Sequence, residues 1–63
     1  MNSKIKRIML GLSQKDLAAL SGVSNVTILK IEKGQIDNVK LGTLKKLAAA
    51  LNSTVEELFL KEE

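Results

Sequence analysis

Two segments with helical periodicity follow one another directly between residues 13 and 34, and each begins at a serine and ends at a glycine. Ser13 precedes the first segment and Asp16 follows three residues later, which is the spacing of a capping box. Ser24 precedes the second segment, where its hydroxyl can cap a helix start. Glycine adopts positive φ angles readily, so Gly22 and Gly34 favour tight turns. The pattern therefore predicts two short helices joined by a turn, a helix-turn-helix arrangement.

Helical spacing also recurs outside these segments, and no stretch alternates with the period of two that indicates a β-strand. We expect a first helix from Asn2 to Leu10 ended by Gly11, a fourth helix after a loop at residues 35–38, and a fifth helix opened by a capping box of Thr54 and Glu57. The residues expected to face the core share this spacing: Ile5, Ile8, Met9, Leu17, Ala18, Leu20, Ile28, Ile31, Leu44, Leu47, Ala48, Leu51, Val55, Leu58 and Phe59.

The length of 63 residues predicts a single domain spanning residues 1–63. The chain has one aromatic residue and no proline, so aliphatic side chains must fill its core. The expected fold class is all-α, a compact bundle of five short helices with the helix-turn-helix at its centre.

Cysteine and histidine are both absent, which excludes disulfides, thiol nucleophiles, histidine acid–base catalysis and the usual zinc sites. The pair Glu56 and Glu57 is interpreted as a negatively charged first helical turn and not as catalytic carboxylates. We therefore predict no catalytic residue, no metal, no cofactor and no small-molecule ligand, and the chain is not expected to be an enzyme. No apolar run approaches the length of a membrane span and no signal peptide is evident, so a cytoplasmic location is expected.

The net charge of +3 is unevenly distributed along the chain. Residues 1–46 hold nine basic and three acidic side chains, whereas four glutamates gather near the C-terminus. An excess of basic residues in the first two-thirds of the chain favours a polyanionic partner.

Periodicity also assigns the faces of the helix that begins after Ser24. With Ile28 and Ile31 pointing inward, the opposite face is centred on Val26 and Lys33 and flanked by Asn25, Leu29 and Lys30. A helix that projects an asparagine and two lysines outward, with its N-terminal end free, is suited to enter the major groove of DNA, where its first residues reach base edges.

Residues 4 to 60 resemble the lambda-repressor-like helix-turn-helix family of phage repressors, Cro proteins and XRE-type regulators. The resemblance rests on motifs in matching order: Gly11-Leu12-Ser13-Gln14, Leu17-Ala18, Gly22-Val23-Ser24, Ile28, Ile31-Glu32-Lys33-Gly34 and Leu47-Ala48-Ala49-Ala50-Leu51. The chain departs from the family pattern at three positions: Ser3 and Ser53 replace apolar residues, and Val39 replaces a proline.

The resemblance implies roles for individual residues. Asn25, Val26 and Lys30 correspond to base contacts, with Asn25 leading because asparagine pairs well with adenine. The positions that correspond to contacts with the DNA backbone are Ser13, Gln14, Thr27, Lys33 and Lys40. Gln14 is further expected to brace Asn25. Arg7 and Glu32 correspond to a partly buried ion pair that is structural.

The expected function is sequence-specific binding of double-stranded DNA by a transcriptional regulator that reads the major groove with the helix 25–33, and the regulator is expected to repress phage, mobile-element or bacterial genes. One such domain contacts few base pairs, so a homodimer on a palindromic operator is expected, held by the fourth and fifth helices. Phe59 is open to two interpretations, as a core residue or as a dimer contact. The alternative function is a protein-interaction or antitoxin-like module with the same fold. A minimal regulator and the DNA-binding part of a longer protein both remain consistent with the sequence.

Overall fold

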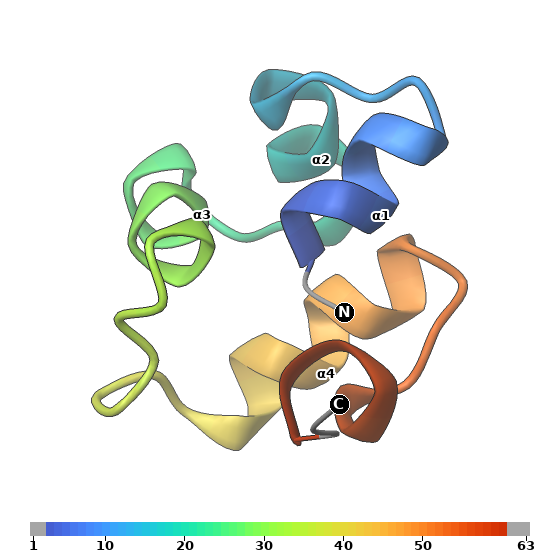
Figure 1. The fold of residues 1–63 in the computed structure, drawn as a ribbon. Coiled ribbons are helices and arrows are strands. Elements are labelled where there is room, and N and C mark those ends of the chain that lie inside the picture. Colours follow the sequence, from blue (N-terminus) through green and yellow to red (C-terminus); the bar gives the residue numbers. More distant parts are fainter. Residues whose placement is uncertain (1–2, 61–63) are drawn as a thin grey trace.

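The helix boundaries follow the capping signals of the sequence. The computed structural model describes residues 3–60, so Asn2, the expected first residue of the first helix, lies outside the described residues. The elements in chain order are α1 (Ser3–Met9), α2 (Gln14–Ser21), α3 (Asn25–Glu32), α4 (Leu41–Ala50) and η1, a π-helical turn (Glu56–Leu60). The described part of the chain contains no strand. The predicted all-α fold of five short helices is thereby confirmed (Figure 1).

The caps on either side of the central turn are formed as predicted. The Ser13 hydroxyl accepts a hydrogen bond from the Asp16 backbone at 2.9 Å, and the Asp16 carboxylate accepts one from the Ser13 backbone at 3.0 Å. Gly22 ends α2 with a φ of 75°, and its N–H donates to the carbonyl of Ala18. The Ser24 hydroxyl then accepts from the Thr27 backbone at 3.2 Å and opens α3. These local bonds fix where α2 ends and α3 begins.

The core lies where α2, α3, α4 and η1 meet. Its buried apolar members are Leu17, Val23, Ile28, Ile31, Leu44, Leu47, Ala48, Leu51 and Leu58. Ala18, Val39, Val55 and Phe59 are half-buried and pack against this cluster. The inward faces predicted for α3 and α4 are therefore confirmed, and Val39 supplies packing at the position where the family pattern has a proline.

The prediction that Leu20 is buried is wrong, because its side chain is 63% exposed. The inward face of α2 is formed by Leu17, Ala18 and Ser21. Ser21 lies about 40° from Leu17 around the helix, whereas Leu20 lies about 60° away in the opposite direction. The hydroxyl of Ser21 is satisfied inside the helix, since it donates to the carbonyl of Leu17 at 2.7 Å. Its half-buried position therefore leaves no polar group unpaired.

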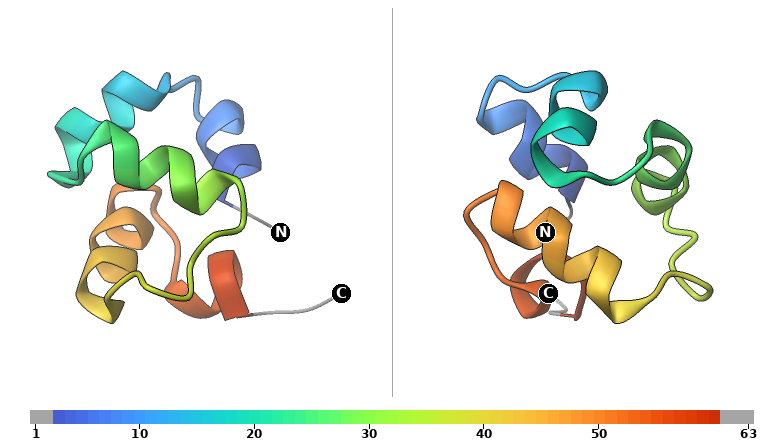
Figure 2. Two further views of the ribbon diagram at one scale, coloured as in Figure 1. Left: turned by 90° about the vertical axis from the view of Figure 1, so that its left-hand side faces the viewer. Right: turned by 180° about the vertical axis from the view of Figure 1, so that it is seen from behind.

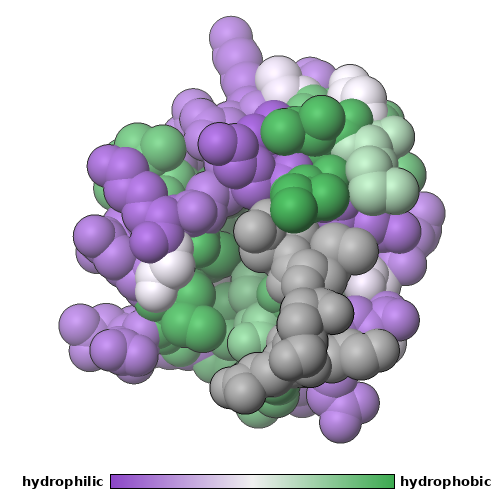
Figure 3. Space-filling model, viewed as in Figure 1, coloured by the Kyte–Doolittle hydropathy of each residue, from purple (hydrophilic) through white to green (hydrophobic). Residues whose placement is uncertain are grey.

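The orientation predicted for the first helix is also wrong. Ile5, Ile8 and Met9 are 48%, 57% and 69% exposed, whereas Ser3 and Arg7 on the other face are buried. Three apolar residues at helical spacing indicated an inward stripe. The helix is turned instead by Arg7, whose guanidinium reaches the last residue of α3. Hydrophobic atoms consequently gather on the surface over α1 in Figure 3.

The last turn is held by short-range polar bonds. The Thr54 hydroxyl accepts from the Glu57 backbone at 3.1 Å, which is one of the two bonds of the predicted capping box, and the Ser53 hydroxyl donates to the Glu57 carboxylate at 2.8 Å. Ser53 therefore has a local bonding role at a position where the family pattern is apolar. Within residues 3–60, none of the helices is long and apolar enough to cross a bilayer.

Candidate nucleic-acid interface

Helix α3 presents the face that its periodicity predicts. Ile28 and Ile31 are buried, and the side chains on the opposite face are exposed: Asn25, Val26, Lys30 and Lys33. In the left-hand view of Figure 2, α3 lies across the front of the molecule. In Figure 3, where α3 is on the left-hand side, hydrophilic atoms project along that side. The orientation of the helix is confirmed, whereas the contacts of these side chains with DNA stay predictions.

The start of α3 keeps a hydroxyl donor available. The Thr27 hydroxyl oxygen accepts a hydrogen bond from the Ser24 hydroxyl at 2.9 Å. A hydroxyl that accepts one bond still carries its own hydrogen, which can be donated to an anion. Thr27 is half-buried beside the exposed Lys30. This arrangement suits a contact with a phosphate oxygen.

A groove joins α3 to the start of α4. It has a volume of about 680 Å³, and its lining includes Thr27, Lys30, Lys40 and Thr43. Lys40 is the N-cap residue of α4, but its side chain accepts no hydrogen bond from the first amide groups of this helix. The groove is lined by two lysines, the N-terminus of α4 and one carboxylate, that of Asp37, so its net charge is positive. The sequence did not indicate that Lys30 and Lys40 share a groove, nor that Thr43 lines it.

Ser13 and Gln14 lie at the start of α2, next to Asp16. The hydrogen bonds from the Ser13 backbone and hydroxyl lower the pKa of Asp16 below its ordinary value of 3.8. Asp16 is therefore ionised at neutral pH, and its negative charge lies beside Ser13. A phosphate contact at Ser13 would be weakened by this neighbour, because like charges repel.

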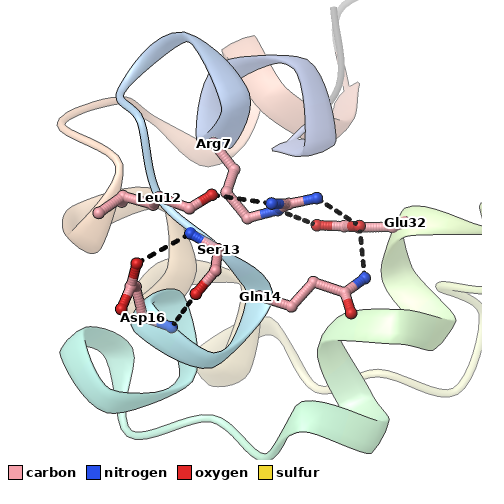
Figure 4. Close-up of polar contacts among 6 residues, drawn as sticks. All are labelled: Arg7, Leu12, Ser13, Gln14, Asp16 and Glu32. Carbon is pink, nitrogen blue, oxygen red and sulfur yellow. Dashed lines mark hydrogen bonds and ion pairs between the residues drawn. The ribbon is translucent and has the colours of Figure 1, made fainter.

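Three elements meet at the carboxylate of Glu32 (Figure 4). Arg7 Nε donates to Oε2 at 2.7 Å and Arg7 Nη2 donates to Oε1 at 3.3 Å, while Arg7 Nη1 donates to the carbonyl of Leu12 at 2.8 Å. The amide nitrogen of Gln14 donates to Oε1 of Glu32 at 2.9 Å. The structure thus holds the ion pair that the resemblance implied, and adds Gln14 to it.

This bond differs from the one expected for Gln14. Glu32 is the last residue of α3, whereas Asn25, which Gln14 was expected to brace, is the first. The physical reason is charge, since an ionised carboxylate attracts an amide donor more strongly than a neutral side chain does. Burial raises the pKa of Glu32, but the hydrogen bonds from Arg7 and Gln14 and the charges of Arg7 and Lys4 outweigh it and leave the pKa below its ordinary value of 4.5.

Comparison with known proteins identifies the fold. A helix-turn-helix family model matches residues 4–58. An HTH-type transcriptional regulator of Haemophilus influenzae is 53% identical over 49 residues, which are 78% of this chain and 49% of that protein. One from Methanocaldococcus jannaschii is 39% identical over 66 residues and is covered over 97% of its length. A Mycobacterium tuberculosis relative that bears the antitoxin name HigA3 is 39% identical over 49 residues, 78% of this chain and 45% of that protein.

The chain thus spans about half the length of the Haemophilus and Mycobacterium relatives, and nearly all of the Methanocaldococcus one. No solved structure matches. The family model covers the helix-turn-helix, the groove at α4 and the Glu32 cluster together. The chain therefore belongs to the lambda-repressor-like, XRE-type helix-turn-helix family.

Proposed function

We propose that the protein is a transcriptional regulator that binds double-stranded DNA with sequence specificity and reads the major groove with the helix at residues 25–33. The observation that carries this proposal is the orientation of α3, whose two isoleucines are buried and whose polar face is open. The named relatives support it, because two of them are HTH-type transcriptional regulators. Binding DNA also places its site of action in the cytoplasm of a bacterial or archaeal cell.

The exposed face divides into base and backbone contacts. Asn25 is the leading base reader, Val26 can pack on a thymine methyl, and Lys30 can reach guanine. Thr27 and Lys40 bind phosphates at the groove between α3 and α4, and Lys33 binds a phosphate at the end of α3. Gln14 and, more weakly, Ser13 bind the backbone from the start of α2.

The experiment that tests the function is selection of bound duplexes from a random pool, followed by binding measurements on the recovered sequence. Asn25→Ala should cost about 1–3 kcal/mol on that sequence and relax one base preference. Lys33→Ala should lower the affinity for every duplex about equally. It should also make the plot of log affinity against log salt concentration less steep, because each neutralised phosphate contributes roughly 0.9 to that slope. If both variants bound all duplexes as the parent does, α3 would not be the reading helix.

The regulator is proposed to act as a homodimer on a palindromic operator, with half-sites about 34–36 Å apart, and to repress transcription. A second groove of about 380 Å³ lies between α4 and η1 and includes Lys45, Ala48 and Glu56 in its lining. Small residues allow a second copy to approach closely, and the two opposite charges can pair across a two-fold axis. Lys45→Glu should weaken dimerisation on DNA, and adding Glu56→Lys should restore it; unchanged dimerisation in the single variant would exclude this surface.

The second candidate function is a protein-interaction module of the antitoxin type. The observation that favours it is the exposed apolar side of α1, at Ile8 and Met9, together with the relative named as an antitoxin. Titration of the protein with random duplex DNA separates the two candidates. A DNA-binding regulator retains the duplex at low salt and releases it steeply as the salt concentration rises. Absence of retention at low salt would favour the protein-interaction module.

A further inference from the structure

The carboxylate of Glu32 connects the structural core of the domain to a side chain that the proposed function places on DNA. Its side chain is only 5% exposed, and it receives donors from α1 through Arg7 and from α2 through Gln14. A carboxylate at the end of a helix faces the negative end of the helix dipole, so it needs such donors to remain charged. The residue therefore does more than tie α3 to α1, since it also holds Gln14.

An ionised carboxylate has only acceptor atoms. The Gln14 side chain must therefore turn its amide nitrogen, and not its carbonyl oxygen, toward Glu32, as the 2.9 Å bond records. That nitrogen carries two hydrogens, of which Glu32 takes one. A DNA phosphate also has only acceptor oxygens, so it needs the remaining hydrogen of the same nitrogen.

We propose that Glu32, itself held by Arg7, is a positioning residue that fixes the orientation of the Gln14 amide, so that its second N–H is presented to a DNA phosphate. The inference rests on the proposed function and explains how the protein orients Gln14 for its contact with the DNA backbone. Without the carboxylate, the amide can rotate by half a turn and present its carbonyl oxygen, which repels a phosphate. Arg7 acts one step further away, because its two bonds hold the Glu32 carboxylate in place.

Glu32→Gln tests the proposal, because the loss of a negative charge and the loss of positioning predict opposite changes in the affinity for DNA. Removal of one negative charge should by itself tighten binding to DNA. Positioning predicts instead that the affinity for a duplex recovered from the random pool falls about tenfold, the loss expected for one hydrogen bond to a charged group. The salt dependence should not fall, because Gln14 carries no charge. Asp37→Asn is the charge-matched control: it removes one negative charge without changing a partner of Gln14 in the described structure, and because Asp37 lines the groove with Lys30 and Lys40, this variant should bind DNA at least as tightly as the parent.

The coupling between the two residues separates positioning from general damage to the fold. Gln14→Ala alone should lose about as much affinity as Glu32→Gln, and Glu32→Gln should weaken binding no further when Gln14 is already alanine. An equal loss in both backgrounds would overturn the proposal, as would a Gln14→Ala variant that binds like the parent. The latter result leaves the proposed function intact if Lys33→Ala still weakens binding. Failure of the parent itself to bind any duplex would instead refute the proposed function.

A second measurement needs no variant of Glu32 and so does not depend on its folding. In nuclear magnetic resonance spectra of the parent, one hydrogen of the Gln14 amide nitrogen should resonate downfield because it is bonded to the carboxylate. On addition of the same duplex, that resonance should stay in place and the other hydrogen should move downfield. If the first resonance moved back upfield on binding, the amide would have left Glu32, and the proposal would be wrong.

Discussion

Replacement of Arg7 by methionine tests how far the stability of this small domain depends on one buried polar cluster. The side chains of Arg7 and Glu32 are 10% and 5% exposed, and the guanidinium makes two bonds to Glu32 and one to the carbonyl of Leu12. Methionine has a similar length but no donor, so among the described residues the Glu32 carboxylate keeps only the hydrogen bond from Gln14. Leaving such a charge uncompensated costs about 3–5 kcal/mol.

That cost is large for a chain of 63 residues, whose total free energy of unfolding is expected to be about 3–9 kcal/mol. The midpoint of thermal unfolding, followed by circular dichroism at pH 7, should therefore fall by at least about 12 °C. The matched control is the double variant Arg7→Met/Glu32→Leu. It buries no charge, and it should recover much of the stability lost by the single variant.

The reasoning would be refuted by a single variant whose midpoint falls by less than about 4 °C, which corresponds to roughly 1 kcal/mol or less. A double variant that is less stable than Arg7→Met would also contradict it, because the penalty would then come from lost packing and not from an isolated charge. Urea unfolding of the same proteins checks that the midpoint shifts report the free energy of unfolding.

Three further predictions concern the hydrophobic core, the turn after α2 and the stability of the protein at low pH. Leu51→Ala should lower the free energy of unfolding by about 2–5 kcal/mol in urea titrations, because this side chain is 0% exposed. Gly22→Ala should cost about 1–2 kcal/mol in the same assay, since a Cβ at this glycine meets nothing within 4 Å and the cost comes only from its φ of 75°. The pKa of Glu32 is lower in the folded protein than its ordinary value of 4.5, so its contribution to stability is present above that pH and is lost as the pH falls through the folded pKa. The thermal midpoint should accordingly decline as the pH is lowered from about 5 to 3, and this decline should be shallower in Glu32→Gln.

The parts of the fold that the sequence predicted depend on residues close together in the chain. The bonds of Ser13 with Asp16 and of Ser24 with Thr27 each span three residues, so they form once the local segment is helical. The burial of Ile28 and Ile31 follows from periodicity in the same way. The orientation of α3, on which the candidate interface depends, could therefore be derived without knowledge of the other helices.

The parts that the sequence did not predict depend on partners far apart in the chain. The resemblance implied the ion pair of Arg7 with Glu32, which lies 25 residues away, but nothing near Arg7 indicated that this pair would leave Ile5 and Ile8 of α1 exposed. The apolar spacing of Ile5, Ile8 and Met9 predicted the opposite orientation, because hydrophobic periodicity ignores a buried ion pair. The shared groove of Lys30 and Lys40 likewise depends on the path of the loop between α3 and α4.

The cluster around Glu32 combines a structural role and a proposed functional role, and the double variant Arg7→Met/Glu32→Leu separates them. Apolar replacements can restore stability, since neither buried charge remains. They cannot restore the acceptor that fixes the Gln14 amide, because a leucine side chain has no polar atom. The double variant should therefore unfold at a higher temperature than Arg7→Met and still bind DNA as weakly as Gln14→Ala. Selection for DNA binding, and not for stability alone, would then account for a charged pair at a place where apolar residues would suffice for folding.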